Sequence, residues 1–219
     1  MTMDDDYYAY AKRWFGREAP VYWIFDRVVA GVRHTVVEVT NARPRSRILD
    51  VATGTGEQAF VFAQRGHEVV GIDLSEDMLR VAREHNKDSG VICDVGDAAH
   101  MPYKDDHFDV SCISFALHDM PRSIRENVVK EMARVTKANG IIVIVDYAVP
   151  AKNLLRSLFL RIARLGETKF FPEFMQSGLT EALKTAGIQI IMEVPILAGL
   201  GRISKGVNMK GCANKNIVG

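Results

Sequence analysis

Apolar and polar positions follow two patterns along the chain, and the changes from one pattern to the other predict its secondary-structure elements. Short apolar runs are typical of buried strands, and they fall at residues 47–51, 68–72, 90–93, 107–114 and 141–145. Helical spacing of apolar residues marks 57–65, the stretch that follows Ser75, and 121–137. Strands that alternate with helices in this way predict an open α/β sheet, in which ligands bind outside the carboxyl ends of the strands.

The two ends of the chain follow other patterns. Residues 5–39 predict two helices, the segment 154–165 has an apolar face, 173–186 predict a helix, and 188–196 and 202–208 a final strand pair. We therefore expect one domain over residues 1–208. It would comprise a helical lid (1–40), a cofactor-binding core (41–150), and a lid helix with C-terminal strands (151–208). Residues 209–219 are expected to form a tail.

Composition narrows the class of protein. The chain has 219 residues and a formal net charge of +1, which gives no reason to expect a nucleic-acid partner. Its three cysteines form no C-x-x-C pair, which favours free thiols in a reducing compartment. No apolar run approaches the ~20 residues that span a bilayer, so we expect a cytoplasmic protein without stable membrane insertion. Histidine and cysteine spacing predicts no metal site, and no pattern indicates the oligomeric state.

A glycine-rich loop follows the first predicted strand. Gly54-Thr55-Gly56-Glu57-Gln58-Ala59 satisfies G-x-G-x-x-A, and Asp73 comes 19 residues after Gly54, where a ribose-binding acid belongs. A carboxylate at Asp50 would repel a pyrophosphate and favour a ligand with a cationic end. S-adenosylmethionine has a ribose, an ammonium and a sulfonium, and it has no phosphate. Asp50 would also cap the loop by accepting N–H groups, and we expect both roles.

Four separated motifs carry a family resemblance. They are ILDVATGTGE, VVGIDLSEDML, CDVGDAAHMPYKDDHFDV, and SFALHDMP followed by EMARVTKANGIIVIVDYAVP. In order and spacing they resemble the class I S-adenosylmethionine-dependent methyltransferases, most nearly the methyltransferase type 11 group with the ubiquinone and menaquinone enzymes. The resemblance implies a Rossmann-like sheet of order 3-2-1-4-5-7-6 with strand seven antiparallel, helices on both faces and an N-terminal helical lid.

The same resemblance implies a set of cofactor contacts. Asp73 would bind both ribose hydroxyls, Asp97 would accept the adenine amino group, and Ser114 and Phe115 would lie under the methionine part. The implied cofactor-binding residues are Asp50, Ala52, Thr53, Gly54, Gly56, Asp73, Leu74, Asp97, Ala98, Ser114 and Phe115.

The methyl acceptor is less sharply indicated. Lys137-Ala138-Asn139-Gly140 replaces the usual Lys-Pro-Gly-Gly, and Asp146-Tyr147-Ala148 replaces the Glu-aromatic-Ser of the quinone enzymes. We expect a small-molecule acceptor, with an apolar or quinone-like one as the candidate. His118 is the candidate catalytic residue, as an acceptor contact or general base; a helix-capping role together with Asp119 is the alternative. Tyr10, Tyr22 and Tyr147 are candidate substrate or lid residues.

Two other functions share part of this pattern. An NAD-dependent oxidoreductase would use the glycine loop and Asp73, but it leaves Asp50 and the Gly96-Asp97-Ala98 stretch unexplained. A non-catalytic S-adenosylmethionine-binding protein would bind the cofactor without turnover. The Asn/Asp-Pro-Pro-aromatic motif of many DNA and protein methyltransferases is replaced by Ser114-Phe115-Ala116-Leu117, which favours a small-molecule acceptor.

Overall fold

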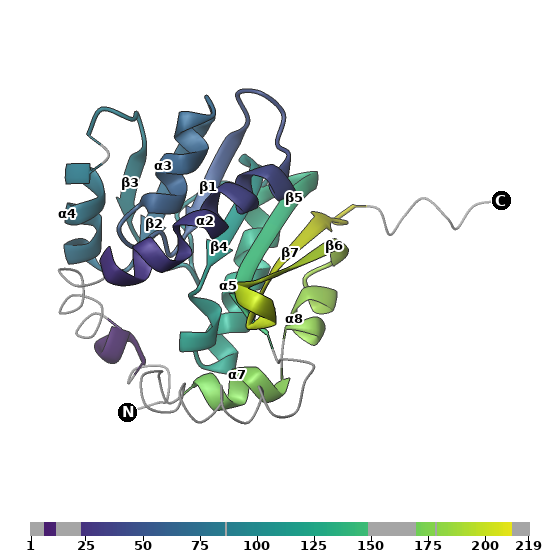
Figure 1. Ribbon diagram of the computed structural model, residues 1–219. Coiled ribbons are helices and arrows are strands. Elements are labelled where there is room, and N and C mark those ends of the chain that lie inside the picture. Colours follow the sequence, from purple (N-terminus) through teal and green to yellow (C-terminus); the bar gives the residue numbers. More distant parts are fainter. Residues whose placement is uncertain (1–6, 12–22, 86, 149–169, 178, 212–219) are drawn as a thin grey trace.

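The computed structural model describes residues 7–11, 23–85, 87–148, 170–177 and 179–211 (Figure 1). Residues 7–11 are helical. The longer elements, in chain order, are α2 (Trp23–Thr40), β1 (Arg47–Val51), α3 (Glu57–Gln64), β2 (Glu68–Asp73), α4 (Glu76–His85), β3 (Ile92–Val95), β4 (Phe108–Ser114), the 3-10 turn η1 (Leu117–Asp119), α5 (Arg122–Val135), β5 (Thr136–Tyr147), α7 (Phe171–Ser177), α8 (Thr180–Thr185), β6 (Ile188–Ile196), the 3-10 turn η2 (Leu197–Gly199) and β7 (Gly201–Asn208).

The strands form one seven-stranded sheet in the order β3-β2-β1-β4-β5-β7-β6. The neighbours from β3 to β5 are parallel, whereas β7 runs antiparallel to both β5 and β6. The predicted Rossmann-like topology is therefore confirmed. The chain order reverses between β1 and β4, and at such a switch point the loops diverge and leave room for a ligand.

Two apolar cores hold the helices against the sheet. Ile48 and Leu49 are adjacent on β1 and fully buried, and they point to opposite faces because side chains alternate along a strand. Ile48 packs in a core with Val36 of α2 and Phe62 of α3. Leu49 packs in the other core with Met132 of α5 and residues of α7 and α8. Helices thus cover both faces (Figure 1).

Some predicted boundaries were wrong. β3 begins at Ile92, two residues later than expected, and β5 begins at Thr136 rather than at residue 141. Asn139, expected to make a turn with Gly140, instead adopts a φ of 60° within β5, and the pairing of β4 with β5 shifts register opposite this point. A Cβ on Gly140 would lie 2.9 Å from the Asp109 carbonyl oxygen, so this irregular stretch needs glycine.

One predicted helix is interrupted in the structure, and several predicted segments lie outside the described residues. The single helix predicted for 173–186 is two helices, α7 and α8, and the break surrounds Gly178, which is not described. The predicted helix 154–165, Pro20, Tyr22 and most of the predicted tail also lie outside the described residues. In the part of the chain that the structure describes, no helix has the length and apolar character needed to cross a membrane.

Asn208 joins the last strand to the end of α5. Its fully buried amide donates hydrogen bonds to the carbonyl oxygens of Ala133 and Thr136, each at 2.8 Å. Asn208→Ala is expected to lower the free energy of unfolding by about 1–3 kcal/mol, because two buried acceptors lose this donor. Urea unfolding measures the change. Glu193→Ala on the exposed edge strand is the control, with less than ~1 kcal/mol expected; an equally small loss for Asn208→Ala would contradict the assignment.

Candidate functional site

The glycine loop turns sharply between β1 and α3. Gly54 and Gly56 adopt φ values of 56° and 78°, in the left-handed region that glycine tolerates best. The Thr53 N–H donates to the Ile72 carbonyl at 3.0 Å, and the Gly56 N–H donates to the Thr53 carbonyl at 2.9 Å. These bonds fix the loop against β2, so that its backbone borders the carboxyl end of the sheet.

Asp73 ties this loop to the next helix. One carboxylate oxygen accepts the Gly54 N–H at 2.9 Å, and the other accepts the Ser75 N–H at 2.8 Å. Burial raises the pKa of Asp73, and the backbone bonds oppose that shift. A carboxylate has about four lone-pair sites, so both oxygens retain capacity for hydroxyl donors from a ligand.

Asp97 lies in the loop after β3 and meets the N-terminal segment. Its Oδ1 accepts the Ala99 N–H at 2.8 Å, and its Oδ2 accepts the hydroxyl of Tyr8 at 2.8 Å. The Tyr8 contact spans 89 positions in the chain, and the sequence had given Tyr8 no such role. It places helical residues 7–11 directly against the predicted adenine end of the site.

A cavity gathers most of the predicted cofactor residues. Its lining includes Ala52, Gly54, Asp73, Leu74, Asp97, Ala98, Ser114 and Phe115, together with Tyr7, Tyr8 and Asp119. A second cavity on the α2 side of the loop is lined by Asp50, Thr53 and Arg33. Ala52, Gly54, Ser114 and Phe115 line both, so the two cavities meet at the glycine loop.

Two residues at this meeting point have unusual backbones. Ala52 and Phe115 adopt φ values of 52° and 51°, although neither is glycine. Such conformations cost of order 1–3 kcal/mol each and gather at ligand sites, where the surrounding structure enforces them. Here they follow β1 and β4, the two strands that flank the switch point.

Gly56 was also predicted to contact the cofactor. It is not among the described residues that line either cavity, and it forms the entry into α3 instead.

The side chain of Asp50 is almost fully buried. It is 2% exposed and accepts a hydrogen bond from the Thr53 hydroxyl at 2.5 Å. Burial raises the pKa of Asp50 to about 7, while the Thr53 bond and the positive charge of Arg33 act in the opposite direction. The backbone of Ala59 in α3 also hydrogen-bonds to Asp50 and lowers its pKa, in line with the predicted acceptance of N–H groups, while the Thr53 hydroxyl is a donor that the prediction did not include.

His118 is held between two carboxylates. Its Nδ1 lies 2.7 Å from Asp146 Oδ1, and its Nε2 lies 3.4 Å from Asp119 Oδ2. The ring is 4% exposed and, within the described part of the chain, borders neither cavity, whereas Asp119 lines the first. His118 therefore reaches the cavity through Asp119, and its predicted direct contact with the acceptor stays a prediction. Asp146 had not been singled out from the sequence as a partner of His118.

Of the three candidate tyrosines, the structure describes Tyr10 and Tyr147. Tyr147 packs its ring 4.7 Å from that of His118 and 5.8 Å from that of Phe115, measured between centroids. Tyr10 is partly buried, and among the described lining residues of the two cavities it is absent. The structure instead adds Tyr7, Tyr8 and Arg33. Only the run of tyrosines at the N-terminus had indicated any of these.

The sheet order, the antiparallel seventh strand and the acids after β2 and β3 around one cavity are the features that the resemblance to the class I S-adenosylmethionine-dependent methyltransferases implied. Residues 49–144 match the methyltransferase domain family model. These residues therefore form a methyltransferase domain, and the class predicted from the motifs is confirmed.

The relatives belong to the group that the motifs resembled. The chain is 32% identical over 157 residues to ubiquinone/menaquinone biosynthesis C-methyltransferase UbiE of Ectopseudomonas mendocina. The aligned region covers 66% of this chain and 60% of that protein. The chain is 37% identical over 129 residues to demethylmenaquinone methyltransferase of Paenarthrobacter aurescens, covering 58% and 49%. The chain thus spans about half to three fifths of the length of these relatives.

A solved structure agrees on the fold. A protein from Pyrococcus horikoshii superimposes with a TM-score of 0.68 at 24% identity, over 84% of this chain and 90% of that one. At this identity the likeness concerns the fold alone.

Proposed function

We propose that this protein transfers a methyl group from S-adenosylmethionine to a small molecule whose hydroxyl-bearing ring is apolar or quinone-like. The observation that carries the proposal is the placement of Asp73 and Asp97 in one cavity beside Gly54. A carboxylate at the end of β2 suits the two ribose hydroxyls, and one after β3 suits the adenine amino group. The shared lining of the two cavities supports a ligand longer than adenosine that crosses the glycine loop.

The second cavity suits the methionine end of the cofactor. Asp50 offers a carboxylate to the ammonium group, and Arg33 offers a guanidinium to the carboxylate. Opposite charges at the two residues match the two opposite charges of an amino acid. A dinucleotide pyrophosphate would be repelled by the buried carboxyl of Asp50, so this residue favours S-adenosylmethionine over NAD.

The cofactor supplies an electrophilic methyl group on its sulfonium. We propose that Asp119, at the cavity wall, accepts the hydroxyl proton of the acceptor. The His118 ring lies between the carboxylates of Asp119 and Asp146, and we propose that His118 and Asp146 stabilise the charge on Asp119. The acceptor then donates an electron pair to the methyl carbon, and the carbon–sulfur bond breaks to leave a neutral thioether. Alignment of the acceptor within the cavity supplies much of the remaining rate.

Support for a quinone-like acceptor comes from the names of the two relatives. The replacements at residues 137–140 and 146–148 distinguish this chain from the usual pattern, and Asp146 is now accounted for as the partner of His118. Tyr7 and Tyr8 line the cofactor cavity, which supports the proposed lid over residues 1–40. An apolar, water-poor pocket would result.

Calorimetric titration with S-adenosylmethionine, S-adenosylhomocysteine and NAD tests the cofactor, and a methyl-transfer assay on a quinol analogue tests the reaction. Binding of the first two ligands with transfer supports the proposal. Binding of NAD alone would replace it with the oxidoreductase. Binding of S-adenosylmethionine without turnover on any ring acceptor would favour the non-catalytic binding protein.

Proton release upon cofactor binding tests the role of Asp50. With its pKa near 7, Asp50 is largely protonated at pH 6, and an ammonium placed beside it favours ionisation. Binding of S-adenosylhomocysteine at pH 6 is therefore expected to release about one proton, and binding at pH 9 almost none. Calorimetry in buffers of different ionisation enthalpy counts the protons.

The Asp50→Asn variant is expected to bind without that release, while Asp77→Asn on the exposed start of α4 should behave as wild type. Because burial raises the pKa of Asp50 from 3.8 to about 7, its contribution to stability is present at low pH, declines as the pH rises between these two values, and stays level above them. The unliganded Asp50→Asn variant should lack that decline. Equal proton release by wild type and Asp50→Asn would contradict the placement of the ligand ammonium beside Asp50.

A further inference from the structure

Arg125 is a buried cation behind the His118–Asp146 pair. It lies in α5 and is 1% exposed, although arginine is almost never fully buried unless it is paired. Its Nη2 donates a hydrogen bond to Glu173 Oε1 of α7 at 3.2 Å, whereas its Nη1 is buried and has no hydrogen-bond partner among the described residues. Because arginine stays protonated in proteins, α5 holds a full positive charge in the interior here.

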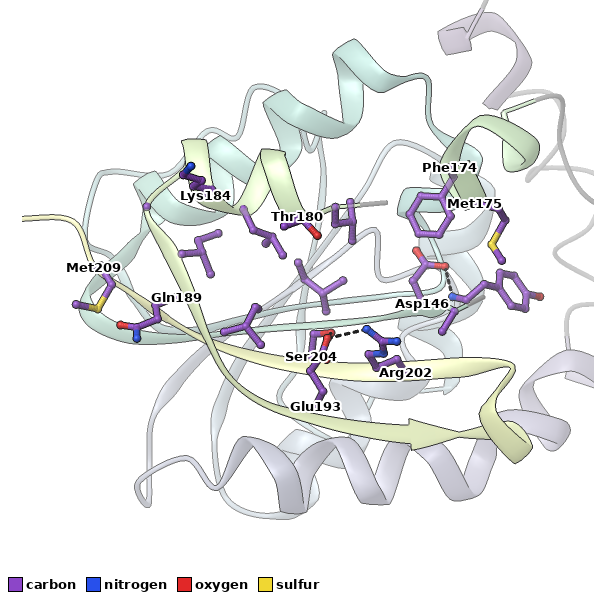
Figure 2. Close-up of a pocket in the computed structure, with 18 residues that line it drawn as sticks. Asp146, Phe174, Met175, Thr180, Lys184, Gln189, Glu193, Arg202, Ser204 and Met209 are labelled. Atoms are coloured by element: carbon purple, nitrogen blue, oxygen red, sulfur yellow. Dashed lines mark hydrogen bonds and ion pairs between the residues drawn. The ribbon is translucent and has the colours of Figure 1, made fainter. Parts of the chain in front are cut away.

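The positive charge of Arg125 lies within electrostatic reach of Asp146. Burial lowers the pKa of Arg125, and the carboxylates of Glu173 and Asp146 oppose that shift. The guanidinium carbon lies 5.2 Å from the centroid of the Phe174 ring, and that ring lies 6.2 Å from the ring of His118. Phe174 is buried and borders the same end of a larger cavity as Asp146 (Figure 2). An apolar ring in this place leaves little room for water, so the charge is weakly screened.

The charged groups form a row from the first cofactor cavity to the surface. Asp119 lines that cavity and faces Nε2 of His118, and Asp146 faces Nδ1. Arg125 comes next, and Glu173, whose side chain is 45% exposed, ends the row in solvent. When His118 is protonated, the signs of the charges alternate along the whole row.

The titratable groups around His118 come from several elements. Among the described residues they are Asp119 on η1, Asp146 and Tyr147 on β5, Arg125 on α5, Glu173 on α7, and Tyr7 of the N-terminal helix near Asp119. Burial raises the pKa of Tyr7, so its phenol is neutral at neutral pH. Within this set, Arg125 is the positive charge that faces the two aspartates from outside the imidazole.

Two carboxylates beside one imidazole favour its protonated form, because each attracts the positive charge. A histidine that stays protonated at all working pH values cannot exchange a proton during a reaction, and acid–base groups act best when they titrate near the working pH. A positive charge beside Asp146 offsets one of the two negative charges.

We propose that Arg125 is a positioning residue for methyl transfer, whose guanidinium offsets the charge of Asp146 and so leaves His118 able to gain and lose a proton near neutral pH. The inference rests on the proposed function, in which His118 acts behind Asp119. It adds to that function a residue that is absent from the described lining of both cofactor cavities.

Two arginine–glutamate pairs on α5 provide matched variants. The Arg125 side chain is 2% exposed in its pair with Glu173, whereas Arg122 pairs with Glu126 at 2.8 Å and is 59% exposed. Arg125→Met removes the buried charge and keeps an apolar chain, a kind of replacement that buried ion pairs often tolerate. Arg125→Lys keeps the charge. Arg122→Met and Glu126→Gln are the controls.

NMR titration of the His118 ring in the cofactor-free protein measures the effect without catalysis, and His118→Gln assigns its signals. The titration midpoint is expected to rise by about one pH unit in Arg125→Met, the effect of one charge ~10 Å away in a protein interior, and to stay near wild type in Arg125→Lys. Glu173→Gln should lower it by about half a unit, because Arg125 then lacks its counter-charge. The controls should shift it by less than ~0.3 unit, because exposed charges are screened.

Shifts of opposite sign in Arg125→Met and Glu173→Gln would support the inference, because a role in packing alone predicts no such reversal. Unchanged midpoints, shifts of the same sign, or a wild-type His118 that stays protonated from about pH 5 to 9 would overturn it. If Arg125→Met fails to fold, Glu173→Gln at the half-exposed end of the row decides by its downward shift alone.

The pH profile of kcat then separates this inference from the proposed function. Its midpoint should move with the His118 titration in each variant. A shifted titration with an unmoved kcat profile would keep the charge effect of Arg125 and contradict the proposed part of His118 in methyl transfer. An unmoved titration in an active enzyme would overturn the role of Arg125 and leave the methyltransferase intact.

Discussion

Replacing Asp73 with alanine is expected to weaken binding of S-adenosylmethionine by about 10²–10⁴-fold. Hydrogen bonds to a charged group contribute about 1.5–3 kcal/mol each, and two ribose hydroxyls would lose their acceptor. The loop would also loosen, because the Gly54 and Ser75 N–H groups bond to the same carboxylate. Calorimetric titration gives the dissociation constant.

Two variants separate binding from folding in that experiment. Asp73→Asn keeps the volume and one acceptor oxygen, so its affinity should fall between those of wild type and Asp73→Ala. Asp77→Ala changes an exposed acid four residues away and should bind as wild type does. A dissociation constant for Asp73→Ala within threefold of wild type, in a protein that melts cooperatively, would place the ribose elsewhere.

Replacing His118 with glutamine is expected to lower kcat by about 10²–10⁴-fold, the range typical of acid–base groups. The dissociation constant for S-adenosylmethionine should stay within about threefold, because within the described residues His118 borders neither cofactor cavity. Single-turnover transfer to a quinol analogue measures the chemical step. His34→Gln on the exposed side of α2 is the control for histidine replacement.

A double variant distinguishes a relay from two separate roles. If Asp119 acts on the acceptor and His118 acts through Asp119, then Asp119→Asn and the double variant Asp119→Asn/His118→Gln should have similar kcat values. Asp146→Asn should lower kcat in the same direction, because Asp146 accepts at Nδ1 of His118. Full turnover in His118→Gln would leave His118 a packing residue beside Tyr147 and Phe171.

The sequence by itself determined the sheet and the glycine loop. Strands β1, β4 and β6 fall at or within one residue of their predicted bounds, because their apolar runs stand between polar turns. Gly54 and Asp73 were predictable as partners, because a fixed strand–helix–strand unit separates them in every fold of this kind. Both signals depend on residues close together in the chain, so they can be recognised in a single sequence.

Tertiary structure alone decided which side chains meet. Tyr8 reaches Asp97 across 89 positions and Asp146 reaches His118 across 28, and no spacing rule connects either pair. Arg33 comes beside Asp50 only because α2 packs over the loop after β1. These contacts follow from strand order and helix placement, which are set by the burial of the whole chain.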